Sequence, residues 1–133
     1  MAKPDAPTQL RPPDGLWRRR VASFGHAFRG VGSALRSEVH LRFHAVATVV
    51  VLGLGFYCGL GRLEWALVAL AVAGVWTAEL LNTAIEALTD LASPNFHPLA
   101  GKAKDVAAGA VLLAAAGAAA VGALVFGPHL FPT

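Results

Sequence analysis

Long apolar runs separated by short polar stretches dominate this chain, and their pattern predicts four helices. From Trp17 to Leu35 apolar residues recur in alternating steps of four and three, which is the spacing of one face of an amphipathic helix. Three later stretches are uncharged, or nearly so, over lengths typical of membrane helices. We therefore expect an all-α integral membrane fold with an N-terminal surface helix and three transmembrane spans. The predicted bounds are 16–42 for the surface helix and about 43–60, 63–91 and 105–127 for the spans.

Polar and proline-rich segments separate these elements. Residues 1–15 are expected to form a flexible polar tail, which leaves 16–133 as a single membrane domain. After the second span, Ser93-Pro94-Asn95 predicts a turn and Pro98 extends it into a loop of about a dozen residues. Asp105 stands where the N-cap of the last span is expected.

The composition supports membrane insertion. Hydrophobic residues make up 56% of the chain and charged residues 14%, against about 25% charged in an average soluble domain. A soluble bundle of hydrophobic helices is the competing interpretation, but its outer helices would need a charged face, and the run Val106–Gly127 has none.

The basic residues predict the orientation. Most of them precede the first span: Lys3, Arg11, Arg18, Arg19, Arg20, Arg29, Arg36 and Arg42. Lys102 and Lys104 lie in the second loop, and none follows the third span. By the positive-inside rule the N-terminus and the second loop are cytoplasmic. Nucleic acid is another use for a basic N-terminus, but beside three spans the expected partners are anionic membrane lipids.

Candidate chemistry lies on one polar face of the second span. Glu79, Asn82, Glu86 and Asp90 fall within an arc of roughly 80° on a helix, and Thr83 lies on the same face. The uncharged part of the span, Trp65–Ala78, is shorter than the about 20 residues that cross a bilayer. An ionisable residue within a span costs about 2.5–3.5 kcal/mol on insertion scales, so these acids are expected to be functional.

The spacing of the acids suggests two distinct jobs. Glu79 and Glu86 are about 10.5 Å apart along a helix, so one can take a proton while the other holds a divalent cation. The following loop adds Lys102, Lys104 and Asp105 at the same end. Carboxylates, lysines and a cation at a membrane surface suggest a bound polyphosphate nucleotide. A proton relay in a transporter subunit uses similar residues and remains an alternative.

Other familiar signatures are weak. There is no Walker A loop, because Gly101-Lys102 is followed by Ala103. His40 and His44 stand one helical turn apart, a spacing that suits either a metal or two histidines at the membrane interface. Cys58 is expected to be a small buried hydrophobe.

The motif around Glu79 resembles the prokaryotic diacylglycerol kinase family of small membrane lipid kinases. The resemblance rests on Ala78-Glu-Leu-Leu-Asn-Thr-Ala-Ile-Glu86, on Asp90, and on the stretch His97–Gly109 with its Lys-Asp pair. Phe24–Gly30 and Glu38 also fit in order and spacing, and the resemblance covers roughly 17–127. It implies a homotrimer in the bacterial inner membrane that transfers phosphate from ATP, with Mg²⁺, to a lipid alcohol.

The resemblance also implies roles for individual residues. Glu79 is the expected general base toward the lipid hydroxyl, and Glu38 and Glu86 are the expected Mg²⁺ ligands. Three residues are expected to support the site and hold phosphates: Asn82, Lys104 and Asp105. Five are expected to contact the nucleotide: Arg19, His26, Asn95, Phe96 and His97.

Two branches of the family differ in the alcohol they phosphorylate. The diacylglycerol branch carries an acidic residue six positions after the first metal-binding glutamate, where this chain has His44. Together with Arg42 and Ser93-Pro94, His44 favours undecaprenol over diacylglycerol. A non-catalytic membrane scaffold, built on the small residues of the third span, is a further alternative.

Overall fold

The computed structural model describes the backbone of residues 16–131 and the side chains of residues 20–131, and it is all-helical over that range. The predicted tail, 1–15, lies outside the described residues. The chain divides into two units, residues 1–32 and residues 33–133. Four helices follow one another along the chain: α1 (Leu16–Ser37), α2 (Val39–Cys58), α3 (Arg62–Ala92) and α4 (Pro98–Leu130).

The helix α1 is amphipathic, as its apolar spacing predicts. Phe24 and Phe28 on its apolar stripe are largely exposed. Its predicted place on the membrane surface stays a prediction. The helix ends at Ser37, earlier than the predicted residue 42, because Glu38 takes an extended conformation with φ −98° and ψ 120° and becomes the N-cap of α2. Residues 39–42, predicted as surface helix, are therefore the first turn of α2.

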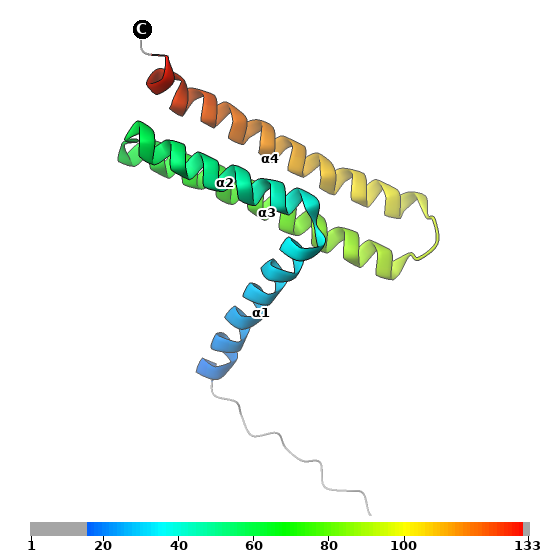
Figure 1. Cartoon of the computed structure of the whole chain (residues 1–133). Coiled ribbons are helices and arrows are strands. Elements are labelled where there is room, and N and C mark those ends of the chain that lie inside the picture. The colour runs from blue at the N-terminus through cyan, green and yellow to red at the C-terminus, as the bar shows by residue number, and fades with distance from the viewer. Residues whose placement is uncertain (1–15, 132–133) are drawn as a thin grey trace, which may run out of the picture. The chain divides into compact units, whose positions relative to one another are not determined.

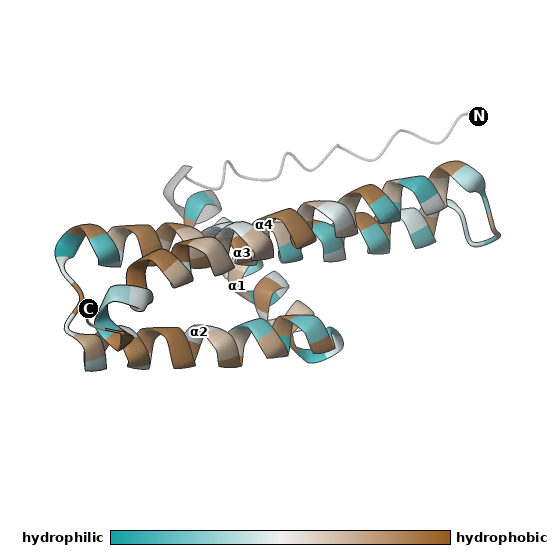
Figure 2. Ribbon diagram, turned by 90° about the horizontal axis from the view of Figure 1, so that it is seen from above, coloured by the Kyte–Doolittle hydropathy of each residue, from teal (hydrophilic) through white to brown (hydrophobic). Residues whose placement is uncertain are grey.

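Helices α2, α3 and α4 are each long and apolar enough to cross a membrane. Figure 1 shows them side by side, with α3 and α4 joined by the short connection 93–97. Many large apolar side chains on them are exposed, among them Val49, Phe56 and Leu112. Apolar surface on this scale suits a lipid environment. Figure 2 shows apolar residues along most of the three helices, with hydrophilic residues gathering in α3 towards the connection to α4.

The small buried core lies around the α2–α3 turn. Leu60 and Val68 pack with Val125 and Phe126 near the end of α4. The turn is made by Gly59, whose φ of 66° is left-handed and whose N–H bonds back to the last turn of α2. Gly55 also has to be small, because a Cβ there would lie 2.7 Å from the ring of Trp65.

Polar contacts at the same end tie α3 to α4. The Glu64 carboxylate accepts the Gly61 N–H at 2.7 Å and thereby caps α3. Its other oxygen lies 2.9 Å from Nε2 of His129, near the end of α4. These contacts and the core hold the start of α3 and the end of α4 together. Because α3 and α4 run antiparallel, the end of α3 and the start of α4 meet at the opposite end, and α2 begins beside the second half of α3.

The start of α4 differs from the prediction. Asp105 is not an N-cap: the helix begins at Pro98, and Nδ1 of His97 accepts the Leu99 N–H at 3.2 Å. Proline suits the first position of a helix, where its missing N–H leaves no bond unmade. The predicted loop of about a dozen residues is therefore the short segment 93–97, and Lys104 and Asp105 are helical.

Candidate functional site at the polar end of α3

Glu79 is the centre of the candidate site. Among residues 20–131 it is the one charged side chain that is buried, with 5% of its surface exposed. Its carboxylate oxygen Oε1 lies 3.0 Å from Nε2 of His44 on α2. A buried carboxylate is costly unless it has a polar or charged partner, and His44 is that partner within the described chain. The sequence analysis did not single out this partner of Glu79.

Asn82 and Glu86 form a second contact on the same face of α3. Nδ2 of Asn82 donates to Oε1 of Glu86 at 3.1 Å, one helical turn away. Oδ1 of Asn82 is buried and has no hydrogen-bond partner within the part of the chain that the structure describes. A buried acceptor without a partner is unusual in a folded protein. The face therefore presents free oxygen acceptors between Glu79 and the end of the helix.

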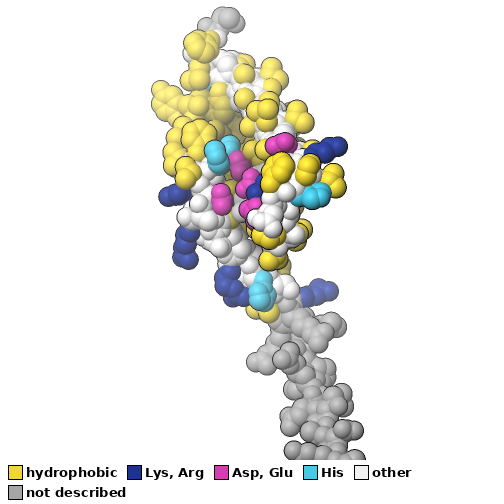
Figure 3. All heavy atoms as spheres, turned by 90° about the vertical axis from the view of Figure 1, so that its right-hand side faces the viewer, with side chains coloured by type: hydrophobic (Ala, Val, Ile, Leu, Met, Phe, Trp, Pro, Cys, Tyr) yellow, Lys and Arg dark blue, Asp and Glu magenta, His cyan; other side chains and the backbone are white. Residues whose placement is uncertain are grey.

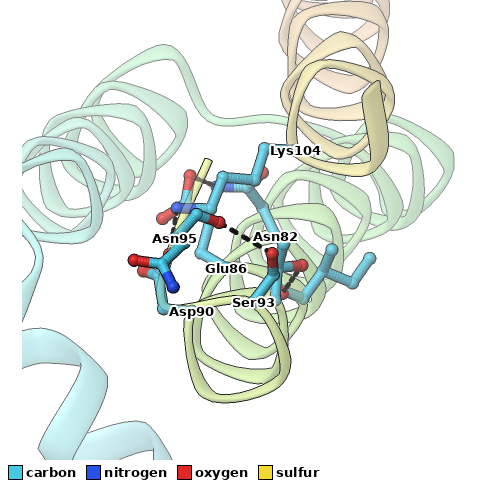
Figure 4. Close-up of polar contacts among 8 residues, drawn as sticks. Asn82, Glu86, Asp90, Ser93, Asn95 and Lys104 are labelled. Atoms are coloured by element: carbon cyan, nitrogen blue, oxygen red, sulfur yellow. Dashed lines mark hydrogen bonds and ion pairs between the residues drawn. The ribbon is translucent and has the colours of Figure 1, made fainter. Parts of the chain in front are cut away.

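Asp90 and Lys104 make the third contact and link α3 to α4. Nζ of Lys104 donates to Oδ1 of Asp90, and Figure 4 shows the lysine reaching across from α4. Both side chains are partly exposed, so the pair itself adds little stability. From the sequence, Asp90 is expected on the polar face of the second span. Its contact with Lys104 puts it beside the predicted phosphate-binding lysine.

The connection 93–97 forms one wall of a cavity of about 240 Å³. Ser93 Oγ donates to the Asn95 carbonyl at 2.8 Å and closes the turn, as Figure 4 shows. Several of the residues that line this cavity belong to the predicted site: Asn95, Phe96, His97 and Lys104. The structure thus brings the predicted nucleotide loop and the predicted phosphate lysine to one concave surface.

Acidic, basic and histidine side chains gather at this end. Figure 3, which looks onto it, shows the acidic side chains close together, with the hydrophobic surface lying beyond them. No acidic, basic or histidine side chain lies between Trp65 and Ala78 in α3 or between Val106 and Pro128 in α4. The polar end is thus a local feature of an otherwise apolar bundle.

The predicted metal ligands Glu38 and Glu86 differ in their contacts, and the predicted nucleotide contacts Arg19 and His26 lie in α1. Glu38 is the N-cap of α2 and Glu86 contacts Asn82. In α1, His26 Nδ1 lies 2.9 Å from Arg29, and the side chain of Arg19 lies outside the described residues. Asp105 follows Lys104 in α4 and is exposed.

The chain is similar in sequence to known proteins over most of its length. The profile of the prokaryotic diacylglycerol kinase family matches residues 25–126, most of the chain. The chain is 45% identical to the undecaprenol kinase of Bacillus subtilis, over 84% of this chain and 91% of that protein. It is 38% identical to a diacylglycerol kinase of Synechocystis, over 97% of this chain and 75% of the relative. It is 30% identical to the Escherichia coli diacylglycerol kinase, over 72% of this chain and 79% of the relative.

The matched region contains the buried Glu79, the Asn82–Glu86 contact and Lys104. Both the profile and the relatives cover well over half of the chain. The chain therefore belongs to the prokaryotic diacylglycerol kinase family and is a multi-pass membrane lipid kinase that uses ATP.

Proposed function

We propose that the protein phosphorylates undecaprenol at the cytoplasmic leaflet of the bacterial inner membrane, with Mg²⁺ and ATP, and yields undecaprenyl phosphate. The observation that carries the proposal is the buried carboxylate of Glu79 at the polar end of an otherwise apolar bundle. A lipid alcohol reaches this depth from the bilayer, and a nucleotide reaches the neighbouring loop from water. Diacylglycerol is the alternative acceptor.

Glu79 is the proposed general base. As the lipid hydroxyl oxygen attacks the γ-phosphorus of ATP, its O–H bond breaks and the proton passes to the free oxygen of Glu79. The bond between the γ-phosphorus and the β,γ-bridging oxygen breaks, and ADP leaves with that electron pair. Burial suits this role because it keeps competing water away from the carboxylate.

Lys104 is the proposed phosphate ligand, with Asp105 supporting it. Ammonium groups bind phosphates as point charges, and Lys104 has three donors of which Asp90 uses one. The residues Asn95, Phe96 and His97 share its cavity and are the proposed contacts of the rest of the nucleotide. His97 already caps α4, so its substitution affects the helix start as well. Arg19 and His26 are further proposed nucleotide contacts.

The residues present fit a magnesium ion. Mg²⁺ prefers oxygen ligands and is usually bound through one or two carboxylates together with substrate phosphates. Glu86 and the proposed second ligand Glu38 supply carboxylates, and the unpartnered Oδ1 of Asn82 is a further oxygen beside Glu86. Among the described residues no three His, Cys, Asp or Glu side chains form a metal cluster. The cation would neutralise charge on the phosphates during transfer.

The choice of undecaprenol is supported by the 45% identity to an undecaprenol kinase and by His44, which contacts the proposed base. The test is a side-by-side assay of the purified chain with Mg·ATP on undecaprenol and on diacylglycerol in matched detergent micelles. We expect the larger kcat/KM with undecaprenol, and no product from either when the magnesium is chelated. A preference for diacylglycerol would establish the alternative, and product from neither would refute the proposal.

We also propose that the working unit is a homotrimer, as the family resemblance implies. Support comes from the exposed apolar faces of α2–α4 and from the small residues of α4, such as Gly117 and Gly122, which permit close helix contact in lipid. Native mass spectrometry of the detergent-solubilised protein is expected to show three copies. An active monomer would contradict this.

A further inference from the structure

His44 touches the proposed base and has no role in the chemistry described so far. Its Nε2 lies 3.0 Å from Oε1 of Glu79, with 20% of the His44 side chain and 7% of the Glu79 side chain exposed. The two residues come from different helices, so the contact depends on how α2 and α3 pack. It is the one polar side-chain contact of the Glu79 carboxylate within the described chain.

The chemistry of the two groups decides which of them can donate a hydrogen across this contact. A carboxylate that acts as a base is ionised, and an ionised carboxylate only accepts hydrogen bonds. The hydrogen between Nε2 and Oε1 therefore belongs to His44. With Oε1 engaged in this way, Oε2 is the oxygen left to take the proton from the lipid hydroxyl.

A second polar contact joins the same two helices one turn further on. Nε1 of Trp76 on α3 donates to Oγ1 of Thr48 at 3.0 Å, and Thr48 donates to the His44 carbonyl at 2.7 Å. Within the described chain no hydrogen bond or ion pair joins Thr48 to Glu79. Thr48 therefore provides a comparison: both pairs connect α2 to α3, but only His44 holds the carboxylate.

We propose that His44 is a positioning residue of this kinase: by donating from Nε2 to Oε1 of Glu79, it fixes the rotation of the carboxylate and leaves Oε2 aimed at the acceptor alcohol. The proposal rests on the role of Glu79 given above. No proton passes to His44 in the transfer. A rotation or displacement of about 1 Å at a reacting group can lower a rate by about 100-fold, so an orienting bond is enough to matter.

The decisive substitutions at position 44 either remove or retain the N–H donor to Glu79. His44→Leu removes it at similar size, and His44→Gln keeps an N–H donor on a side chain of comparable reach. Thr48→Val breaks the neighbouring link between α2 and α3 without touching the carboxylate. Each full-length variant is purified, checked for folding by its thermal transition, and assayed with Mg·ATP and whichever of undecaprenol and diacylglycerol the unmodified protein phosphorylates faster.

We expect His44→Leu to lower kcat by about 10- to 100-fold, with the KM for ATP within about twofold. His44→Gln should restore most of kcat, and Thr48→Val should lower the thermal transition while kcat per folded protein stays within about twofold. Equal kcat values for His44→Leu and the unmodified protein would overturn the proposal. So would equal losses in His44→Leu and Thr48→Val, because His44 would then only hold the helices together.

A double variant separates this proposal from the function on which it rests. If His44 acts through the Glu79 carboxylate, His44→Leu should cause a much smaller loss in a Glu79→Asp background, where the shorter side chain no longer reaches Nε2. An undiminished loss in that background would overturn the positioning role while the base role stands. If Glu79→Gln alone retains full turnover, the proposed base is wrong, whatever the His44 variants do.

Discussion

At the scale of single residues, the polar end of α3 is organised as successive side-chain contacts. His44 contacts Glu79, Asn82 contacts Glu86, and Lys104 contacts Asp90. Burial decreases along this series, from a side chain that is 7% exposed at Glu79 to one that is 67% exposed at Asp90. The series therefore runs from a dry environment suited to a lipid hydroxyl to a wet one suited to phosphates.

Lys104→Ala should weaken the binding of ATP without lowering the stability of the protein. The Asp90–Lys104 pair is partly exposed and adds about 0–1 kcal/mol, so the thermal transition should hardly change. If Lys104 holds phosphates, the KM for ATP should rise at least about tenfold, because a charge-assisted contact to phosphate is lost. Steady-state kinetics measure this, with Lys102→Ala as the matched control on the same helix. A normal KM in Lys104→Ala would exclude the proposed role.

Asn82→Leu tests the neighbouring contact. It removes both the donor to Glu86 and the unpartnered oxygen, at similar volume. We expect a reduced apparent affinity for Mg²⁺, measured as a higher magnesium concentration at half-maximal activity, with a folded protein by circular dichroism. An unchanged magnesium dependence would show that Asn82 does not support the cation site.

At the scale of helices, the apolar pattern predicted the number, order and type of elements, but not their ends. The predicted span boundaries followed the onset of apolar residues, whereas α2 and α4 begin several residues earlier, at Val39 and Pro98. Polar residues such as Arg42 and Lys104 lie inside these helices, since a helix can continue beyond the apolar part of a membrane span. The proline rule for helix starts would have indicated Pro98.

Contacts between helices could not be predicted from the sequence. The spacing of Glu79, Asn82 and Glu86 on one face follows from helix geometry alone, and the structure agrees. The partners His44 and Asp90–Lys104 depend on how two helices rotate about their axes when they pack, and one chain's pattern does not specify that rotation. The resemblance implied residue roles but not the His44–Glu79 contact.

Gly55→Ala is a test of helix packing at the end of the bundle away from the site. Its new Cβ would meet the Trp65 ring at 2.7 Å, so the ring or the helix has to move. Overpacking of this kind costs about 1–3 kcal/mol, which thermal unfolding in detergent detects as a lower transition temperature. Gly53→Ala, on the same helix with open space at its Cβ, should be neutral or slightly stabilising. Equal transitions for the two variants would refute the packing argument.

At the scale of the whole molecule, the account requires the polar end to face the cytoplasm, because ATP is there. The distribution of basic residues predicts this orientation. In a Cys58→Ala background, a membrane-impermeant maleimide applied to intact cells should label Gly61→Cys and spare Asn95→Cys. Permeabilised cells serve as the control in which both are labelled. If Asn95→Cys alone were labelled in intact cells, the site would lie outside the cell while ATP is inside. That result would contradict the predicted orientation.

The most direct test of the central claim is the rate of lipid phosphorylation in a single turnover by Glu79→Gln. The substitution keeps the size of the side chain and removes its basicity. We expect phosphoryl transfer to slow by at least about 100-fold while the Kd for ATP stays within about twofold, since the base acts only in the chemical step. Glu64→Gln, the same change at the far end of α3, should transfer at the unmodified rate. Phosphoryl transfer by Glu79→Gln at the unmodified rate would contradict the account.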